Sequence, residues 1–281
     1  MEEVLDQLLH EVSCSKHAQI HQACTEARDL LENQAGLLGS PPHELRALCL
    51  RALQLALETR QSKMVALAVS GFFKLLRDTQ FHSGYEEDDE TVWLPCQLLS
   101  TMQSLPLHSE DTQVELLKVL LNMCCVSGIT ISGQVVTQVV GVCGLAYGRG
   151  GGALRTAAQS AASQAIAHLI KQLKEESEEQ EKILINKCRE GKEESYDERT
   201  DDDDTEYIAP AYDEIVPVIN LIADKLVEAN KYQEDKKGPE VPALFLLECT
   251  NTLLSQLSHP ENLAHLHKPS ESMSSSVLTE I

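Results

Sequence analysis

The chain repeats one feature from Glu44 to Leu173: apolar side chains recur at helical spacing, with short polar or Gly/Pro breaks between the runs. Each run forms one apolar face of an α-helix, which a single helix cannot bury alone. The pattern therefore predicts stacked helix pairs, which give a long surface with few deep pockets and suit protein binding better than catalysis. Three of these faces comprise Leu45, Leu48, Ala52, Leu55, Ala56 and Leu57; Val65, Leu67, Ala68, Phe72, Leu75 and Leu76; and Val114, Leu117, Leu120, Leu121 and Cys124.

Charge and composition narrow the classes of function. The formal net charge of −21 disfavours nucleic acid and anionic membrane surfaces as direct partners. No signal peptide is recognisable, and the longest apolar stretch, Val135 to Tyr147, is too short and too interrupted to span a bilayer. We therefore expect a soluble, cytoplasmic protein. Its nine cysteines are scattered and odd in number, so most are expected to be small buried apolar residues rather than a disulfide framework.

Helix boundaries follow from prolines, glycines and capping residues. Pro42 is placed to open a helix, while Ser109 and Ser132 are expected N-caps. The valines after Ser132 are spaced by one, three and four residues, which favours helix over strand. The expected helices are Glu2–Val12, Lys16–Asn33, Pro42–Thr59, a helix from Gln61-Ser62 to Asp78, Thr91–Gln103, a helix from Ser109 to Cys125, one after Ser132 that ends before a break at Gly148–Gly152, one from Ala153 past Lys187, Tyr212–Asn230 and Val241–Ser258.

The expected fold class is all-α, an armadillo/HEAT-like solenoid of stacked antiparallel helix pairs. Residues 1–174 form its first domain. Residues 175–211 comprise a charged helix extension and a disordered acidic linker, because 175–206 carries fifteen acidic and five basic side chains. Residues 212–259 start a second helical region, and 260–281 form a disordered polar tail.

Two motifs allow a chemical interpretation. Gly148–Ala153 loosely imitates a dinucleotide-binding turn, but the strand that should precede it is not supported. Nucleotide binding that is lost in a Gly150→Glu variant would favour this enzyme alternative. Cys14, His17, His21 and Cys24 share a helical face, yet the two cysteines lie about 15 Å apart along a helix and cannot complete one tetrahedral zinc site. The sequence therefore predicts no metal, no cofactor and no catalytic residue.

The order of the helices resembles a known family. His17–Cys24, Leu53–Glu58, Phe72–Leu76, Asp111–Leu121 and Val139–Tyr147 followed by Thr156–Leu169 are similar to successive helices of the large, brefeldin-A-inhibited guanine nucleotide-exchange proteins for Arf GTPases. The similarity covers Met1 to about Lys174 and is weaker over Tyr212–Leu257. Met1–Leu5 and Pro41–Arg46 look closest to the third member of that group.

The resemblance implies an N-terminal dimerisation and cyclophilin-binding region that performs no exchange reaction itself. Its implied partners are a second copy, the downstream region of the same protein, and Arf or Arf-like GTPases. The implied role is in vesicle traffic at trans-Golgi or secretory-granule membranes, which it would reach only through partners. Lys118, Gln138 and Tyr147 match family positions and are the candidate partner-binding residues. A generic helical-repeat adaptor unrelated to Arf, and a nucleotide-binding enzyme, remain the alternatives.

Overall fold

The structure, a computed structural model, describes residues 1–12, 16–33, 40–82, 89–126, 128–190, 211–231 and 241–258. These ranges contain ten α-helices, three short 3-10 helices and no strand, which confirms the expected all-α class. The elements are α1 Glu2–Glu11, α2 Ala18–Asn33, α3 Pro42–Glu58, α4 Ser62–Arg77, η1 Thr79–Phe81, η2 Glu90–Val92, α5 Leu94–Thr101, η3 Leu105–Leu107, α6 Glu110–Met123, α7 Gly133–Arg149, α8 Gly152–Glu190, α9 Ala211–Lys231 and α10 Ala243–Leu257.

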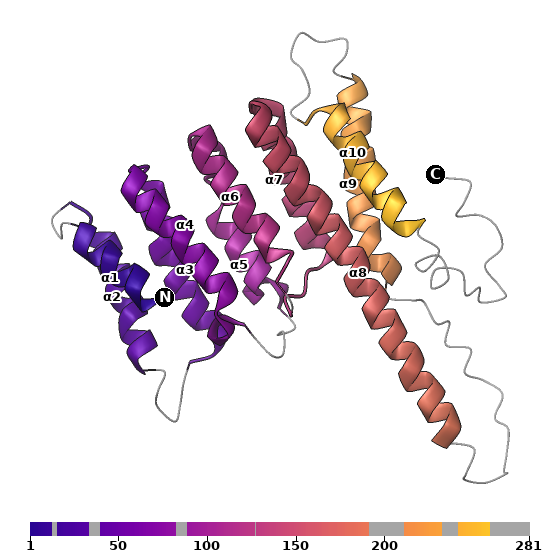
Figure 1. Ribbon diagram of the computed structural model, residues 1–281, viewed down its shortest axis with the longest axis horizontal. Coiled ribbons are helices and arrows are strands. Elements are labelled where there is room, and N and C mark those ends of the chain that lie inside the picture. Colours follow the sequence, from indigo (N-terminus) through magenta and orange to yellow (C-terminus); the bar gives the residue numbers. More distant parts are fainter. Residues whose placement is uncertain are drawn as a thin grey trace.

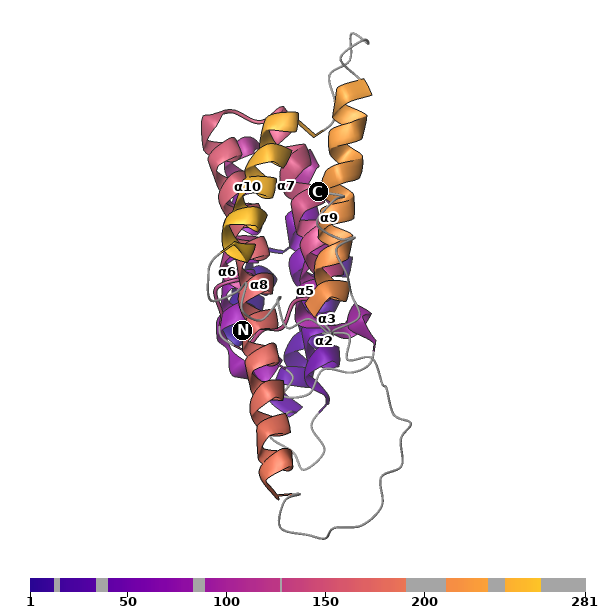
Figure 2. The same ribbon diagram turned by 90° about the vertical axis from the view of Figure 1, so that its right-hand side faces the viewer.

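The helices form two layers that run side by side along the molecule (Figures 1 and 2). In the first layer α1, α4, α6, α8 and α10 follow one another, each in contact with the next. In the second layer the order is α2, α3, α5, α7 and α9. Contacts across the layers join α1 to α2, α3 to α4, α7 to α8 and α9 to α10. The arrangement is that of a helical solenoid, as the apolar faces predict.

Local sequence explains where the helices begin. Pro42 occupies the first turn of α3, where its missing N–H costs nothing. The Ser109 hydroxyl accepts the Thr112 N–H at 3.4 Å, and the Ser132 hydroxyl accepts the Val135 N–H at 3.3 Å. Both expected N-caps are confirmed, and so is a helix rather than a strand over the valines of α7.

Most boundaries differ from the prediction by one to three residues, and two of these differences change a connection between helices. The helix expected from Thr91 begins at Leu94, after the short η2, and Pro95 stands in its first turn. The expected break at Gly148–Gly152 shortens to Gly150 and Gly151, because α7 continues through Arg149. The α7–α8 hairpin is therefore tighter than the glycine content suggests.

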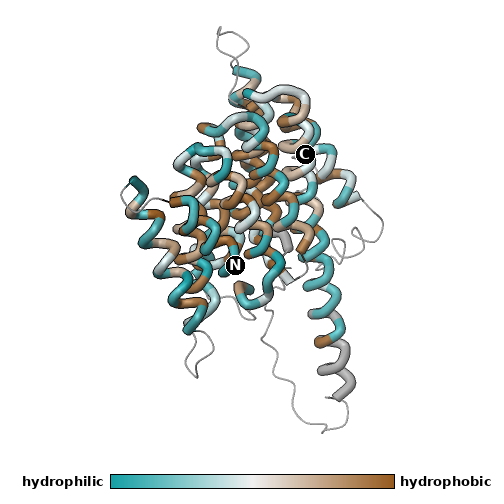
Figure 3. The backbone as a smooth tube through the Cα atoms, turned by 60° about the vertical axis from the view of Figure 1, so that its left-hand side comes forward, coloured by the Kyte–Doolittle hydropathy of each residue, from teal (hydrophilic) through white to brown (hydrophobic). Residues whose placement is uncertain are grey.

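The core is one continuous apolar cluster between the layers, and the hydrophobic residues concentrate in the middle of the stack (Figure 3). In the first half of α8, Ala158, Ala161, Ala162 and Ala165 are fully buried, so small side chains let α8 approach α6 and α7 closely. The second half of α8 extends past the stack and is largely polar (Figures 1 and 3). The predicted linker beyond Glu190 and the predicted tail lie outside the described residues.

A buried arginine fixes the connection between α4 and α5. Arg46 on α3 is fully buried, and its guanidinium donates to the carbonyl oxygens of Phe81 and Val92, each at 2.6 Å. Its Nε donates to the Gln97 side chain at 2.9 Å, and Gln97 in turn donates to the His43 carbonyl at 3.1 Å. One side chain therefore joins α3, η1, η2 and α5.

Candidate interaction surfaces

The solvent-facing side of α7 carries no charge before Arg149. It consists of Gln134, Gln138, Gly141 and Leu145, which are exposed or half-buried and recur at helical spacing; we call it the α7 outer face. Val142, half-buried, borders it. In a chain of formal charge −21, such a face lets a partner approach without removing water from charged groups.

The three candidate partner-binding residues do not form one cluster. Lys118 is exposed on α6 in the first layer and pairs with Glu115 of the same helix at 2.6 Å. Gln138 is exposed at the centre of the α7 outer face. Tyr147 lies nine residues further along α7, which at about 100° per residue turns it to the opposite side of the helix.

Tyr147 contributes to packing at the end of the stack. Its ring lies 5.2 Å from the ring of Phe245 on α10, measured between centroids, and the Arg155 guanidinium lies 5.7 Å from its centroid. The Phe245 side chain is fully buried. Tyr147 therefore links α7 to α8 and α10 at the place where the last helix pair docks.

Two glycines of α7 let α9 and α10 approach closely. A Cβ on Gly133 would lie 1.8 Å from the Glu214 carbonyl oxygen, and one on Gly144 would lie 2.6 Å from a Val241 methyl group. The Gly133 N–H also donates to the Glu214 carboxylate at 2.5 Å. A carboxylate at the N-terminus of α7 is favoured by the helix dipole, so this contact both positions α9 and stabilises α7.

The glycine-rich turn before α8 is occupied by a carboxylate from within the chain. Glu110 at the start of α6 accepts the Gly151 N–H at 3.1 Å, which is where a phosphate would bind in a nucleotide-binding turn. The turn joins two helices, without the preceding strand that the dinucleotide motif requires.

Gly150 is unsuited to test that turn. Its Cβ would lie 2.6 Å from the Leu154 side chain, so Gly150→Glu would disturb packing whether or not a nucleotide bound. Gly152 is the better position, because a Cβ there meets nothing within 4 Å.

Burial makes five cysteines chemically inert. Desolvation raises the pKa of Cys24 to about 11 and the pKa values of Cys49, Cys124 and Cys249 to about 12; it also raises that of Cys143. The thiolate, which is the nucleophile and metal ligand, is therefore scarce at neutral pH. This confirms the interpretation of most cysteines as small buried apolar residues.

The suspected metal cluster is not assembled by the described residues. Cys14 lies outside them, Cys24 is buried, and the His17 ring nitrogen instead lies 3.4 Å from the Gln61 amide. Across the described part of the chain, no group of three or more potential ligands could hold a metal ion. Nor is any described helix both long and apolar enough to cross a bilayer.

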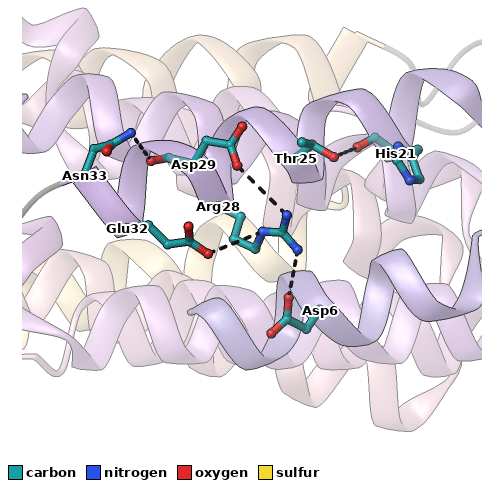
Figure 4. A network of polar contacts seen from close by, with 7 residues as sticks. All are labelled: Asp6, His21, Thr25, Arg28, Asp29, Glu32 and Asn33. Carbon is teal, nitrogen blue, oxygen red and sulfur yellow. Dashed lines mark hydrogen bonds and ion pairs between the residues drawn. The ribbon is translucent and has the colours of Figure 1, made fainter.

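The opposite end of the stack is charged. Arg28 on α2 faces three carboxylates, with nitrogen–oxygen distances of 3.6 Å to Asp6, 4.0 Å to Asp29 and 3.6 Å to Glu32 (Figure 4). The contact with Asp6 ties α1 to α2. Since these groups are substantially exposed, each pair contributes at most about 1 kcal/mol.

Sequence reasoning missed the carboxylates of Glu110 and Glu214. Both act on backbone N–H groups of other helices, 41 and 81 residues away in sequence. The sequence feature that could have indicated these contacts is the glycine at the start of each helix, Gly151 before α8 and Gly133 in α7. Glycine permits the close approach of another segment.

Comparisons with known proteins identify a family for the larger part of the chain. Residues 1–177 match the family model of the Mon2/Sec7/BIG1-like dimerisation and cyclophilin-binding domain. The chain is 31% identical to the human (Homo sapiens) brefeldin A-inhibited guanine nucleotide-exchange protein 3 and 30% identical to the mouse (Mus musculus) protein of that name, each over 270 residues. These alignments cover 95% of this chain but 12% of each relative. No solved structure matches the chain.

Proposed function

Since the chain belongs to the family of Mon2/Sec7/BIG1-like dimerisation and cyclophilin-binding domains, we propose that it is a non-catalytic module that associates with itself and with other proteins in Arf-dependent vesicle traffic. The family match over residues 1–177 carries this proposal. The matched domain is a dimerisation domain and not an exchange domain. Its solenoid geometry supports the same role, because stacked helices offer extended surfaces for recognition.

The finer proposal concerns an Arf-family GTPase. Two relatives carry guanine nucleotide exchange in their names, so a module of this kind would hold a GTPase or the downstream region of an exchange protein. We place the GTPase on the α7 outer face, with Gln138 as a contact residue. Lys118 belongs to a separate contact on the first layer, and Tyr147 acts through the position of α10. The trans-Golgi or secretory granule is the proposed location, reached through these partners.

Self-association is tested by light scattering after size-exclusion chromatography, over a hundredfold range of concentration. The mass should rise from 31.0 kDa, that of one chain, toward twice that value. A mass that stays at one chain throughout would contradict the proposed dimerisation.

GTPase binding is tested by titration with purified Arf-family GTPases in their GTP- and GDP-bound forms. Gln138→Glu should weaken binding about tenfold if the residue lies at the interface centre. Gln19→Glu is the matched control, since Gln19 is an exposed glutamine on α2 of the same layer. A chain that dimerises yet binds no Arf-family GTPase would instead favour a generic helical adaptor.

A further inference from the structure

The last helix pair exposes more large apolar side chains than the rest of the described chain. Among the described residues, seven such side chains are at least 44% exposed, and five of them lie on α9 and α10. The five are Val216, Val227, Leu244, Leu247 and Leu254. Single exposed apolar residues need no explanation, but a set that shares a surface usually marks a contact site.

These residues belong to one exposed row on each helix. On α10 the row is Leu244, Leu247, Asn251 and Leu254, at intervals of three, four and three residues. On α9 it is Val216, Asn220, Ala223 and Val227, at intervals of four, three and four. This is the spacing with which a helix presents a seam to another helix, and neither row contains a charged residue.

Both rows point away from the core. At about 100° per residue, each lies on the side of its helix opposite to the buried residues, among them Val218 on α9 and Cys249 on α10. The two helices close the stack at the end where α7 and α8 lie behind them (Figures 1 and 2). We call the surface formed by the two rows the α9–α10 outer face.

One carboxylate borders each row. Asp224 follows Asn220 by four residues and Glu248 follows Leu244 by four, so each lies about 40° around its helix from the row. Asp224 is exposed and Glu248 is half-buried. Neither forms an ion pair with any described residue. The α9–α10 outer face is therefore apolar with an acidic border.

Nearby basic side chains do not neutralise this border. Lys225 on α9 pairs with Glu228 of the same helix at 2.8 Å. Lys231 is the last residue of α9, beyond the end of its row. On α10 the only charged residue is Glu248. Positive charge for these carboxylates must come from a partner.

Charge also selects the kind of partner. Because the chain has a formal charge of −21, a second copy or an anionic membrane would bring more negative charge to a surface already bordered by carboxylates. A helix with lysine or arginine beside an apolar stripe would cover the rows with its stripe and pair its cations with Asp224 and Glu248. Amphipathic helices bind apolar surfaces in this way.

We propose that the α9–α10 outer face binds a basic amphipathic helix of a partner protein. The site lies outside the family domain, which ends at residue 177, and it requires neither self-association nor the GTPase contact at Gln138. Asn220 and Asn251 place one amide in each row, so a helix with a polar residue opposite an amide is favoured in one register.

The test measures binding of synthetic peptides to the full chain by fluorescence anisotropy. The first peptide has about 21 residues, that is three heptads, with leucine at the seam positions and lysine beside them. The second carries glutamate in place of each lysine, and the third is a scrambled form of the first without an apolar stripe. The first should bind at least about tenfold more tightly than either of the others.

A charge reversal separates this site from general attraction to an acidic protein. Asp224→Lys with Glu248→Lys should weaken binding of the lysine peptide about tenfold and strengthen binding of the glutamate peptide. Glu2→Lys with Glu44→Lys is the matched control, because both residues are exposed, lie on α1 and α3, and change the net charge equally. It should leave the order of the peptides unchanged.

The apolar rows are tested separately. Leu247→Ala with Leu254→Ala should weaken binding of the lysine peptide about tenfold or more, because both side chains would be covered by the partner helix. Both are exposed in the free chain, so the fold should survive, which circular dichroism checks. Leu107→Ala is the matched control, since Leu107 is 62% exposed but lies on η3, outside the last helix pair.

Three outcomes would overturn the proposal. The first is equal binding of the lysine peptide and its scrambled form, and the second is an equal effect of the charge reversal and its control. The third is a dimer that dissociates as the lysine peptide binds, which would assign the face to a second copy. Failure of the chain to dimerise or to bind a GTPase is read in other experiments and leaves this result unaffected.

Discussion

Arg46 is the residue whose removal should most affect local structure. Arg46→Met keeps the side-chain length but leaves the carbonyls of Phe81 and Val92 without their donor. We expect a loss of about 3 kcal/mol or more in the free energy of unfolding, because each unsatisfied buried group costs about 1–3 kcal/mol. Arg51→Met is the control, since Arg51 is exposed on the same helix. Urea unfolding followed by circular dichroism measures the difference; equal midpoints would contradict the structural role of Arg46.

Gly133 and Gly141 give opposite predictions on one helix. Gly133→Ala should destabilise the chain by about 1–3 kcal/mol, because its Cβ would lie 1.8 Å from the Glu214 carbonyl oxygen. To relieve this overlap the backbone of α9 must shift, which costs more than rotating a side chain. Gly141→Ala should stabilise it by about 1 kcal/mol, since its Cβ meets nothing within 4 Å and alanine favours the helix. Thermal and urea unfolding of both variants distinguish the two signs. A gain in stability at both positions would show that α9 does not pack on α7.

The functions of these residues could not be predicted from sequence, for a physical reason. Arg46 stands inside an apolar helical run and looks like an ordinary surface position of that helix. Its acceptors lie 35, 46 and 51 residues away, and nothing local indicates them. Gly133 likewise resembles an ordinary first residue of a helix in the sequence. Its contact on α9, Glu214, is 81 residues away, so the local sequence does not indicate it.

At the scale of elements, α1 is attached to α4 by two ion pairs that depend on pH. Lys74 lowers the pKa of Glu3 and Lys63 lowers the pKa of Glu11. A carboxylate with a lowered pKa in the folded state stabilises that state above its unfolded pKa of about 4.5, and this contribution is lost as the pH falls through the folded value. Stability should therefore decline below about pH 4.5.

The double variant Glu3→Gln, Glu11→Gln checks this expectation. Its free energy of unfolding should be lower than that of the parent at pH 7 and should fall less between pH 5 and 3. Both effects should shrink in 1 M salt, because the pairs are exposed and screened. Parallel pH profiles of the parent and the variant would show that neither pair contributes.

Helices themselves were largely predictable, because their signals are local. Ser109 and Ser132 cap the helices they were expected to cap, and the apolar spacing separated helix from strand in α7. The layers were not predictable in the same way. Whether α3 lies beside α2 in one layer or crosses to the other depends on contacts between distant faces, and each apolar face is compatible with several neighbours.

At the scale of the whole molecule, the solenoid has mostly neighbour-to-neighbour contacts, so destabilisation should remain local. Phe245→Ala removes a fully buried ring at the α7–α10 contact, which typically costs about 3–5 kcal/mol. Hydrogen exchange should accelerate in α9, α10 and the adjoining part of α7, and remain unchanged in α1 to α4. Leu8 is fully buried on α1, at the opposite end of the stack. Leu8→Ala should therefore accelerate hydrogen exchange in α1 to α4 and leave α9 and α10 unchanged.

These two variants decide whether the end pair can act separately from the family domain. If α9 and α10 open while residues 1–177 stay protected, the last helix pair can be engaged or released without unfolding the surface around Gln138. If both variants accelerate exchange equally in all the described helices, the stack is one cooperative unit. A partner bound at one end would then change the stability of the whole array. A variant at that end would also alter binding at the other end.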